Sequence, residues 1–164
     1  MKRRGIALGM AAGAVWAVAL VWLGVAVVDI PVFLLAPSLA FAFLGPGLVL
    51  AALIARFAAR RFFDDALIDG AAPPPGSAAE VDLRVLRNTA EQLLLALCLW
   101  PPTAWLLVGD GPGVAVTLGV GFVVARAAFW IGYRTMPPLR AFGFAATFYP
   151  TLAAALWAGL HWML

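Results

Sequence analysis

Five long apolar runs are the feature that most limits what this chain can fold into. Each run is near or above the ~20 residues that an α-helix needs to cross about 30 Å of hydrocarbon. The runs cover approximately residues 5–28, 32–63, 88–108, 114–133 and 142–164. Backbone groups in lipid must be hydrogen-bonded internally, and a helix achieves this within a single segment. The pattern therefore predicts an all-α membrane protein with five crossings.

The composition supports a membrane environment. Of the 164 residues, 65% are hydrophobic and 12% are charged, whereas a soluble domain carries about 25% charged residues. A soluble fold of this size would leave a large apolar surface in water. The formal net charge is +3, but the basic residues stand at the ends of apolar runs and form no contiguous basic surface for phosphates. We therefore expect membrane lipid, and no nucleic acid, as a partner.

Residues that bind metals are scarce. Cys98 is the only cysteine and His161 is the only histidine. This set falls short of the ligands that a zinc site needs, and a single cysteine excludes an intrachain disulfide. We expect no metal site.

The connections between the runs predict the topology. Lys and Arg concentrate near the N-terminus, within residues 56–83, where they stand just before the long connection 64–83, and around residues 134–140, whereas residues 29–31 and 109–113 contain none. The positive-inside rule then places the N-terminus and the loop 64–83 in the cytoplasm, in what we expect to be a bacterial inner membrane. We divide the chain into an N-terminal transmembrane helix, 1–30, and a four-helix membrane domain, 31–164.

The first run also has features of a signal peptide, because Lys2, Arg3 and Arg4 precede it. Its apolar stretch is longer than the usual h-region of about 7–15 residues, and residues 26–28, directly before Asp29, do not form an A-x-A cleavage site. We therefore expect a retained helix.

Polar side chains interrupt the third run. They are costly in lipid and usually face a partner or a wet cavity. Arg84, Asn88 and Glu91 are spaced i, i+4 and i+7, which places them on one face of a helix. This face is a candidate binding surface.

The fourth run contains Arg126, which shares a helix face with Phe129 and Tyr133 at i, i+3 and i+7. A tight turn joins the third and fourth runs, so we expect antiparallel neighbours. Counted from the cytoplasmic end, Glu91 and Arg126 come to a similar depth, and we expect them to lie close enough to pair. Such a pair either serves a ligand or only fixes the register of the two helices.

Six arginines crowd the expected cytoplasmic ends of different helices. They are Arg60, Arg61, Arg84, Arg87, Arg134 and Arg140. They are either anchors that extend to the lipid head groups, or some of them converge on an anionic ligand. The second interpretation draws on the planar guanidinium, which binds both oxygens of a carboxylate.

Two motifs in these runs resemble the MAPEG family, membrane-associated proteins in eicosanoid and glutathione metabolism. Residues 84–92 resemble the family's second-helix signature, and residues 125–140 resemble its third helix with the turn that follows. The matching residues are Arg84, Asn88, Glu91, Arg126, Tyr133 and Arg140. Arg60 and Arg61 resemble the paired arginines that close the family's first helix. The resemblance covers about residues 32–164.

The resemblance implies a fold and a function. Known members are four-helix subunits of homotrimers that bind glutathione between subunits, so the chain would be a glutathione transferase or peroxidase that acts on lipophilic electrophiles. Glutathione would be a co-substrate, and Arg140, which resembles the arginine that stabilises its thiolate, would be the catalytic residue. Glutathione would be bound by Arg84, Asn88, Glu91, Arg126, Tyr133 and Arg61, with Glu91 facing its amine.

Three features depart from the family pattern. Phe129 stands where several members have tyrosine, Leu86 stands where some have a polar residue, and the first run adds a helix to the usual four. These departures keep open a non-enzymatic membrane protein of the same fold, in which the Arg and Glu cluster is structural or binds lipid head groups. A transporter is a third class, although five helices with few buried charges leave little room for alternating access.

Overall fold

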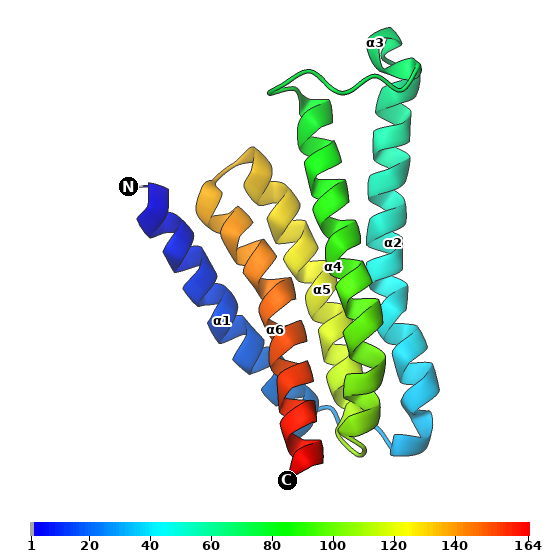
Figure 1. The fold of residues 1–164 in the computed structure, drawn as a ribbon, viewed down its shortest axis with the longest axis vertical. Coiled ribbons are helices and arrows are strands. Elements are labelled where there is room, and N and C mark those ends of the chain that lie inside the picture. The colour runs from blue at the N-terminus through cyan, green and yellow to red at the C-terminus, as the bar shows by residue number, and fades with distance from the viewer. Residues whose placement is uncertain (1) are drawn as a thin grey trace.

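The computed structural model describes residues 2–164 as long helices that lie side by side (Figure 1). The long helices are α1 (Lys2–Ala26), α2 (Leu35–Phe62), α4 (Ala78–Leu106), α5 (Gly111–Arg134) and α6 (Pro137–Met163). Two short elements complete the order, the 3-10 helix η1 (Val32–Leu34) before α2 and the single turn α3 (Asp65–Ile68) after it. All regular structure within residues 2–164 is helical, which confirms the predicted all-α class.

Four of these helices are long and apolar enough to cross a membrane. They are α1, α2 together with η1, α5 and α6. The fifth long helix, α4, runs alongside α5 (Figure 1), but its first half carries the charged residues noted above. The fifth crossing therefore stays a prediction.

Helix α2 continues through residues that often interrupt a helix. Pro37 and residues 45–47 (Gly-Pro-Gly) fall within the second apolar run, yet α2 is continuous through Pro46. A proline has no N–H, so Pro46 cannot donate the helical hydrogen bond to the carbonyl of Ala42. Gly119 of α5 lies directly against that carbonyl, where a Cβ would overlap it. The Ala42 carbonyl, which lacks its usual helical donor, therefore lies at a close contact between α2 and α5.

The predicted loop 64–83 is shorter than expected. It contains α3, and α4 begins at Ala78 because Ser77 caps it. The Ser77 Oγ accepts a hydrogen bond from the Glu80 N–H at 3.1 Å, and Glu80 accepts one from the Gly76 N–H at 2.7 Å. Ser77 and Glu80 have the S-x-x-E spacing of a capping box. The prediction of loop for residues 78–83 was wrong, and the capping signal for it was present in the sequence.

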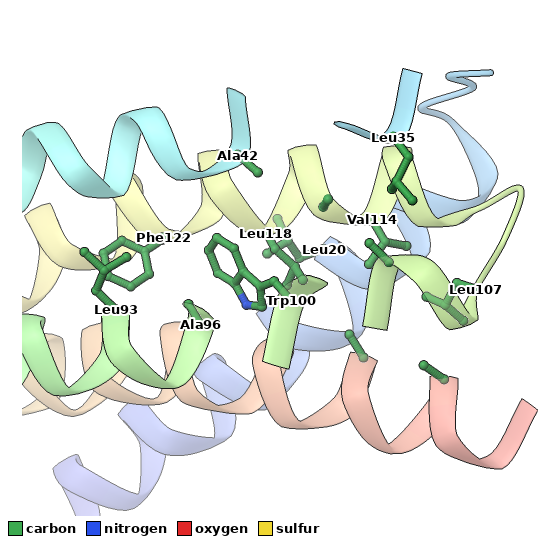
Figure 2. Packing of buried hydrophobic residues seen from close by; sticks show 14 residues of the cluster. Leu20, Leu35, Ala42, Leu93, Ala96, Trp100, Leu107, Val114, Leu118 and Phe122 are labelled. Atoms are coloured by element: carbon green, nitrogen blue, oxygen red, sulfur yellow. The ribbon is translucent and has the colours of Figure 1, made fainter. Parts of the chain in front are cut away.

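Helix α5 is the centre of the bundle and packs against α1, α2, α4 and α6. Figure 2 shows Trp100 of α4 inside this core, near Phe122 and Leu118 of α5. The Trp100 ring stacks on Phe43 and meets Phe122 edge-on. Its indole N–H donates to the Thr151 hydroxyl at 3.1 Å, so the polar atom of this buried side chain is satisfied.

Helix α1 packs on α6 through small residues. A Cβ at Gly9 would overlap the carbonyl of Pro138, and a Cβ at Gly13 would overlap the side chain of Ala145. Glycines at this four-residue spacing let two helix backbones approach closely in a membrane. The N-terminal helix is therefore an integral part of the bundle.

The basic residues gather at one end of the bundle. The N-terminus, the connection that contains α3 and the turn between α5 and α6 lie toward this end, whereas the C-terminus and the turn between α4 and α5 lie at the other (Figure 1). We call the first of these the basic end.

Candidate functional site

A buried carboxylate joins three helices at the basic end. Asp82 of α4 is only 2% exposed. It accepts hydrogen bonds from Arg56 of α2 at 3.0 Å and from Arg134 of α5 at 2.9 Å, and Arg60 of α2 also pairs with it. We call these four residues the Asp82 cluster.

Two of its arginines also contact an aromatic ring. The Arg56 and Arg134 guanidiniums lie 5.1 and 4.9 Å from the centroid of Trp130, a cation–π arrangement. Burial on its own raises the pKa of the Asp82 carboxyl, but the hydrogen bonds and charges of the surrounding arginines bring that pKa below its usual range. Asp82 therefore stays ionised at neutral pH. Of the six arginines considered as ligands of an anion, Arg60 and Arg134 pair instead with the protein's own carboxylate.

Arg126 of α5 is buried in the middle of the bundle and is 2% exposed. Its guanidinium donates to Asn88 Oδ1 at 2.8 Å, and to the Gly143 carbonyl and the Thr147 hydroxyl of α6, both at 2.6 Å. It lies 4.4 Å from the centroid of the Phe129 ring. A charged side chain is thus held by neutral acceptors and an aromatic face.

The expected pair between Glu91 and Arg126 does not form. Glu91 is exposed, and among residues 2–164 it takes part in no ion pair. Asn88 lies between the two, since its Oδ1 accepts from Arg126 and its Nδ2 donates to Glu91 at 3.4 Å. Glu91 and Arg126 do lie at similar depth, within about one helical turn. The rotation of α4 about its axis, however, turns Asn88 and not Glu91 toward Arg126.

This arrangement predicts a mild effect for Glu91→Gln. Because Glu91 is exposed and makes one long hydrogen bond, we expect the substitution to change the free energy of unfolding by less than about 0.5 kcal/mol. Expression yield and thermal unfolding in detergent would measure it. A loss comparable to that of a buried ion pair would show that Glu91 has a charged partner in the assembled protein.

Three of the predicted site residues meet in one cleft at the basic end. Asn88 of α4, Tyr133 of α5 and Arg140 of α6 line a cleft of about 450 Å³. The Arg140 guanidinium lies 4.9 Å from the centroid of the Tyr133 ring. Within residues 2–164, Arg140 forms no ion pair and its guanidinium donates no hydrogen bond. Its charge is available to an anion in the cleft.

Phe129, one of the three departures from the family pattern, forms part of the same cleft. Its ring is 4% exposed, supports Arg126 on one side and meets the Tyr133 ring edge-on. The shared face of Arg126, Phe129 and Tyr133 is thus as predicted. Phe129 lacks a hydroxyl that could contact a ligand, but it keeps Arg126 and Tyr133 in place.

The structure does not bring every predicted residue to the cleft. Arg84 is exposed and pairs with Glu80 one turn earlier on α4, at 2.7 Å. Arg61 of α2 donates a 3.4 Å hydrogen bond to the Leu67 carbonyl of α3 and lies on a different surface. Glu91 faces outward beside Asn88. The polar face of α4 predicted from spacing is therefore largely an outer face, and Asn88 is its inward edge.

A sequence model of the MAPEG family matches residues 34–160. The chain belongs to the MAPEG family. The match includes every predicted site residue and the whole of α4 and α5, so membership together with the apolar helices makes the chain an integral membrane protein. Helix α1 of this MAPEG protein lies outside the matched region. Searches among curated proteins and among solved structures found no similar protein.

Sequence reasoning missed Asp82 and Thr147. Asp82 shares a buried helix face with Val85, Thr89 and Ala96, at i, i+3, i+7 and i+14, so helical spacing alone would have grouped it with these residues. The assignment of residues 78–83 to a loop hid this signal. Thr147 lies in an apolar run and gives no comparable signal.

Proposed function

We propose that this MAPEG protein is a glutathione-dependent transferase or peroxidase that acts on lipophilic electrophiles. The observation that supports the proposal is the unpaired guanidinium of Arg140 in a cleft shared with Asn88 and Tyr133. A cation beside a thiol lowers the thiol pKa, and the thiolate is the nucleophile. The catalytic role proposed for Arg140 is to hold that thiolate.

The chemistry needs only the bound glutathione and its partner. In a transfer reaction the thiolate sulfur forms a bond to the electrophilic carbon, the leaving group departs with its electron pair, and the thiol proton passes to water. In a peroxidase reaction the thiolate attacks a hydroperoxide oxygen, and a second glutathione completes the reduction to give the alcohol, water and glutathione disulfide. The apolar substrate would come from the bilayer.

The other residues have binding roles in this proposal. Asn88 would present its amide to the tripeptide, with Arg126 fixing the orientation of that amide through its Oδ1. Tyr133 would contact the ligand from the cleft wall. Glu91 would face the glutathione amine and Arg84 a carboxylate.

We also propose a homotrimer in a bacterial inner membrane, with five crossings and the N-terminus in the cytoplasm. The outer face of α4 supports the assembly, because Glu91 is exposed on it within the third apolar run and a charged group at membrane depth needs a partner. Arg61 would contribute to a site only in a neighbouring subunit. The gathering of arginines at one end supports the orientation.

A non-enzymatic protein of the same fold remains the second candidate. It is favoured by the Asp82 cluster, which satisfies Arg56, Arg60 and Arg134 internally. In that case the remaining arginines bind lipid head groups.

Glutathione titration calorimetry on the purified full chain in detergent separates the two candidates. We expect Arg140→Ala and Asn88→Ala each to weaken glutathione binding at least about tenfold, a loss of about 1.4 kcal/mol. Arg4→Ala removes an exposed arginine at the same end and is the matched control, with unchanged affinity expected. A wild-type protein that binds no glutathione would contradict the enzymatic proposal.

A further inference from the structure

Helix α1 supplies part of the wall of the cleft. Ile6 and Met10 line it together with Asn88, Tyr133 and Arg140. Both residues belong to α1, which lies outside the region that matches the MAPEG family. The cleft of this chain is therefore bounded by a helix that the family match does not include.

The packing of α1 explains why these two side chains reach the cleft. Gly5 and Gly9 form the closely packed stripe against α6, and Ile6 and Met10 follow each glycine by one position. They consequently lie at the edge of the α1–α6 contact, beside the cleft. Because Gly9 contacts the backbone of Pro138 and Phe142, the position of α1 along α6 is fixed, and with it the depth of Met10.

The cleft has a charged part and an apolar part. Arg140 lies in the first turn of α6, and Phe144, which also lines the cleft, follows one turn deeper in the bundle, about 6 Å along the axis. The register with Gly9 places Met10 between these two levels. A ligand that fills the cleft thus meets a guanidinium near the basic end and methionine and phenylalanine side chains farther in.

We propose that α1 determines ligand selectivity, with Ile6 and Met10 holding the apolar part of an amphipathic anion whose charged end pairs with Arg140. Methionine suits this role because its unbranched side chain adapts to different apolar shapes, and Met10 is 43% exposed. The inference rests on the proposed function only where the anion is a glutathione thioether. A long-chain carboxylate also combines an anionic end with an apolar chain, and it is the other class of ligand that fits the cleft.

The experiment measures binding to the full chain in phosphatidylcholine nanodiscs by calorimetry. The probes are glutathione, S-hexylglutathione and dodecanoate. Met10→Trp fills the apolar part of the cleft, and Ala11→Trp places the same ring on the adjacent exposed position as the control. Ile6→Trp is a second filling variant that keeps the test valid if Met10→Trp gives no folded protein.

We expect a filling variant to weaken the binding of an amphipathic probe at least about tenfold relative to Ala11→Trp, and to change glutathione affinity much less. If dodecanoate binds to the wild type and glutathione does not, the proposed enzymatic function fails, and the effect of the filling variants on dodecanoate decides the role of α1. The inference is overturned if the filling variants and Ala11→Trp bind every probe equally, or if neither amphipathic probe binds to the wild type.

Discussion

Replacement of Arg126 by alanine is expected to lower the free energy of unfolding by about 2–4 kcal/mol, because it leaves a cavity beside Phe122 and Phe129. Arg126→Met is expected to restore stability to within about 1 kcal/mol of the wild type. Methionine fills the space between the rings, and the cost of burying a cation without a carboxylate partner disappears. Thermal unfolding in detergent, followed by circular dichroism, measures both variants.

The same methionine variant is expected not to restore ligand binding. The Gly143 carbonyl and the Thr147 hydroxyl keep hydrogen bonds within α6, but Asn88 Oδ1 loses the donor that orients the amide. We expect glutathione affinity to fall about tenfold. If Arg126→Met is as unstable as Arg126→Ala, the hydrogen bonds of Arg126 stabilise the fold itself. That outcome would support a structural role for Arg126 rather than a role in ligand binding.

Replacement of Asp82 by asparagine is expected to lower the free energy of unfolding by about 2–3 kcal/mol, since it removes the shared partner of three arginines. The value lies below that for a fully buried pair because Arg56, Arg60 and Arg134 are each about a third or more exposed, so water partly replaces the lost carboxylate. For a chain of this length the unfolding midpoint should fall by about 5–10 °C.

Two comparisons make this prediction specific. Asp69→Asn is the same change at an exposed aspartate and should alter stability by less than about 0.5 kcal/mol. Because the folded state lowers the pKa of Asp82, its stabilising contribution is complete above the unfolded pKa of about 3.9 and is lost as the pH falls through the lower folded value. Equal stabilities of Asp82→Asn and the wild type at neutral pH would show that the cluster does not hold the helices together.

The helices and the gathering of basic residues at one end of the bundle could be predicted because both follow from local rules. Apolar runs of sufficient length form helices in lipid, and the arginines that define the basic end are visible one by one in the sequence. The shared faces of Asn88 with Glu91 and of Arg126 with Tyr133 also follow from helical spacing alone. These features require no knowledge of how the helices contact one another.

The contacts between helices could not be predicted in the same way. In a soluble protein, apolar periodicity shows which face of a helix is buried, but in a membrane protein the lipid-facing side is apolar as well. The rotation of α4 about its axis was therefore undetermined. For this reason Glu91, and not Asn88, was predicted to be the partner of Arg126. The contribution of Ile6 and Met10 depends on the contact between α1 and α6, which lie far apart in the sequence.

The contact between Gly119 and the Ala42 carbonyl affects how the two helices can move. Gly119 lies against the Ala42 carbonyl with no side chain between the two helices, so a shift of α5 along α2 by one turn would bring the side chain of Ala115 or Val123 against that backbone. The contact therefore opposes sliding of the two helices past each other. Arg126 and Tyr133 lie on α5, so we expect an opening that admits a bulky molecule to involve the helices on the other side of the cleft.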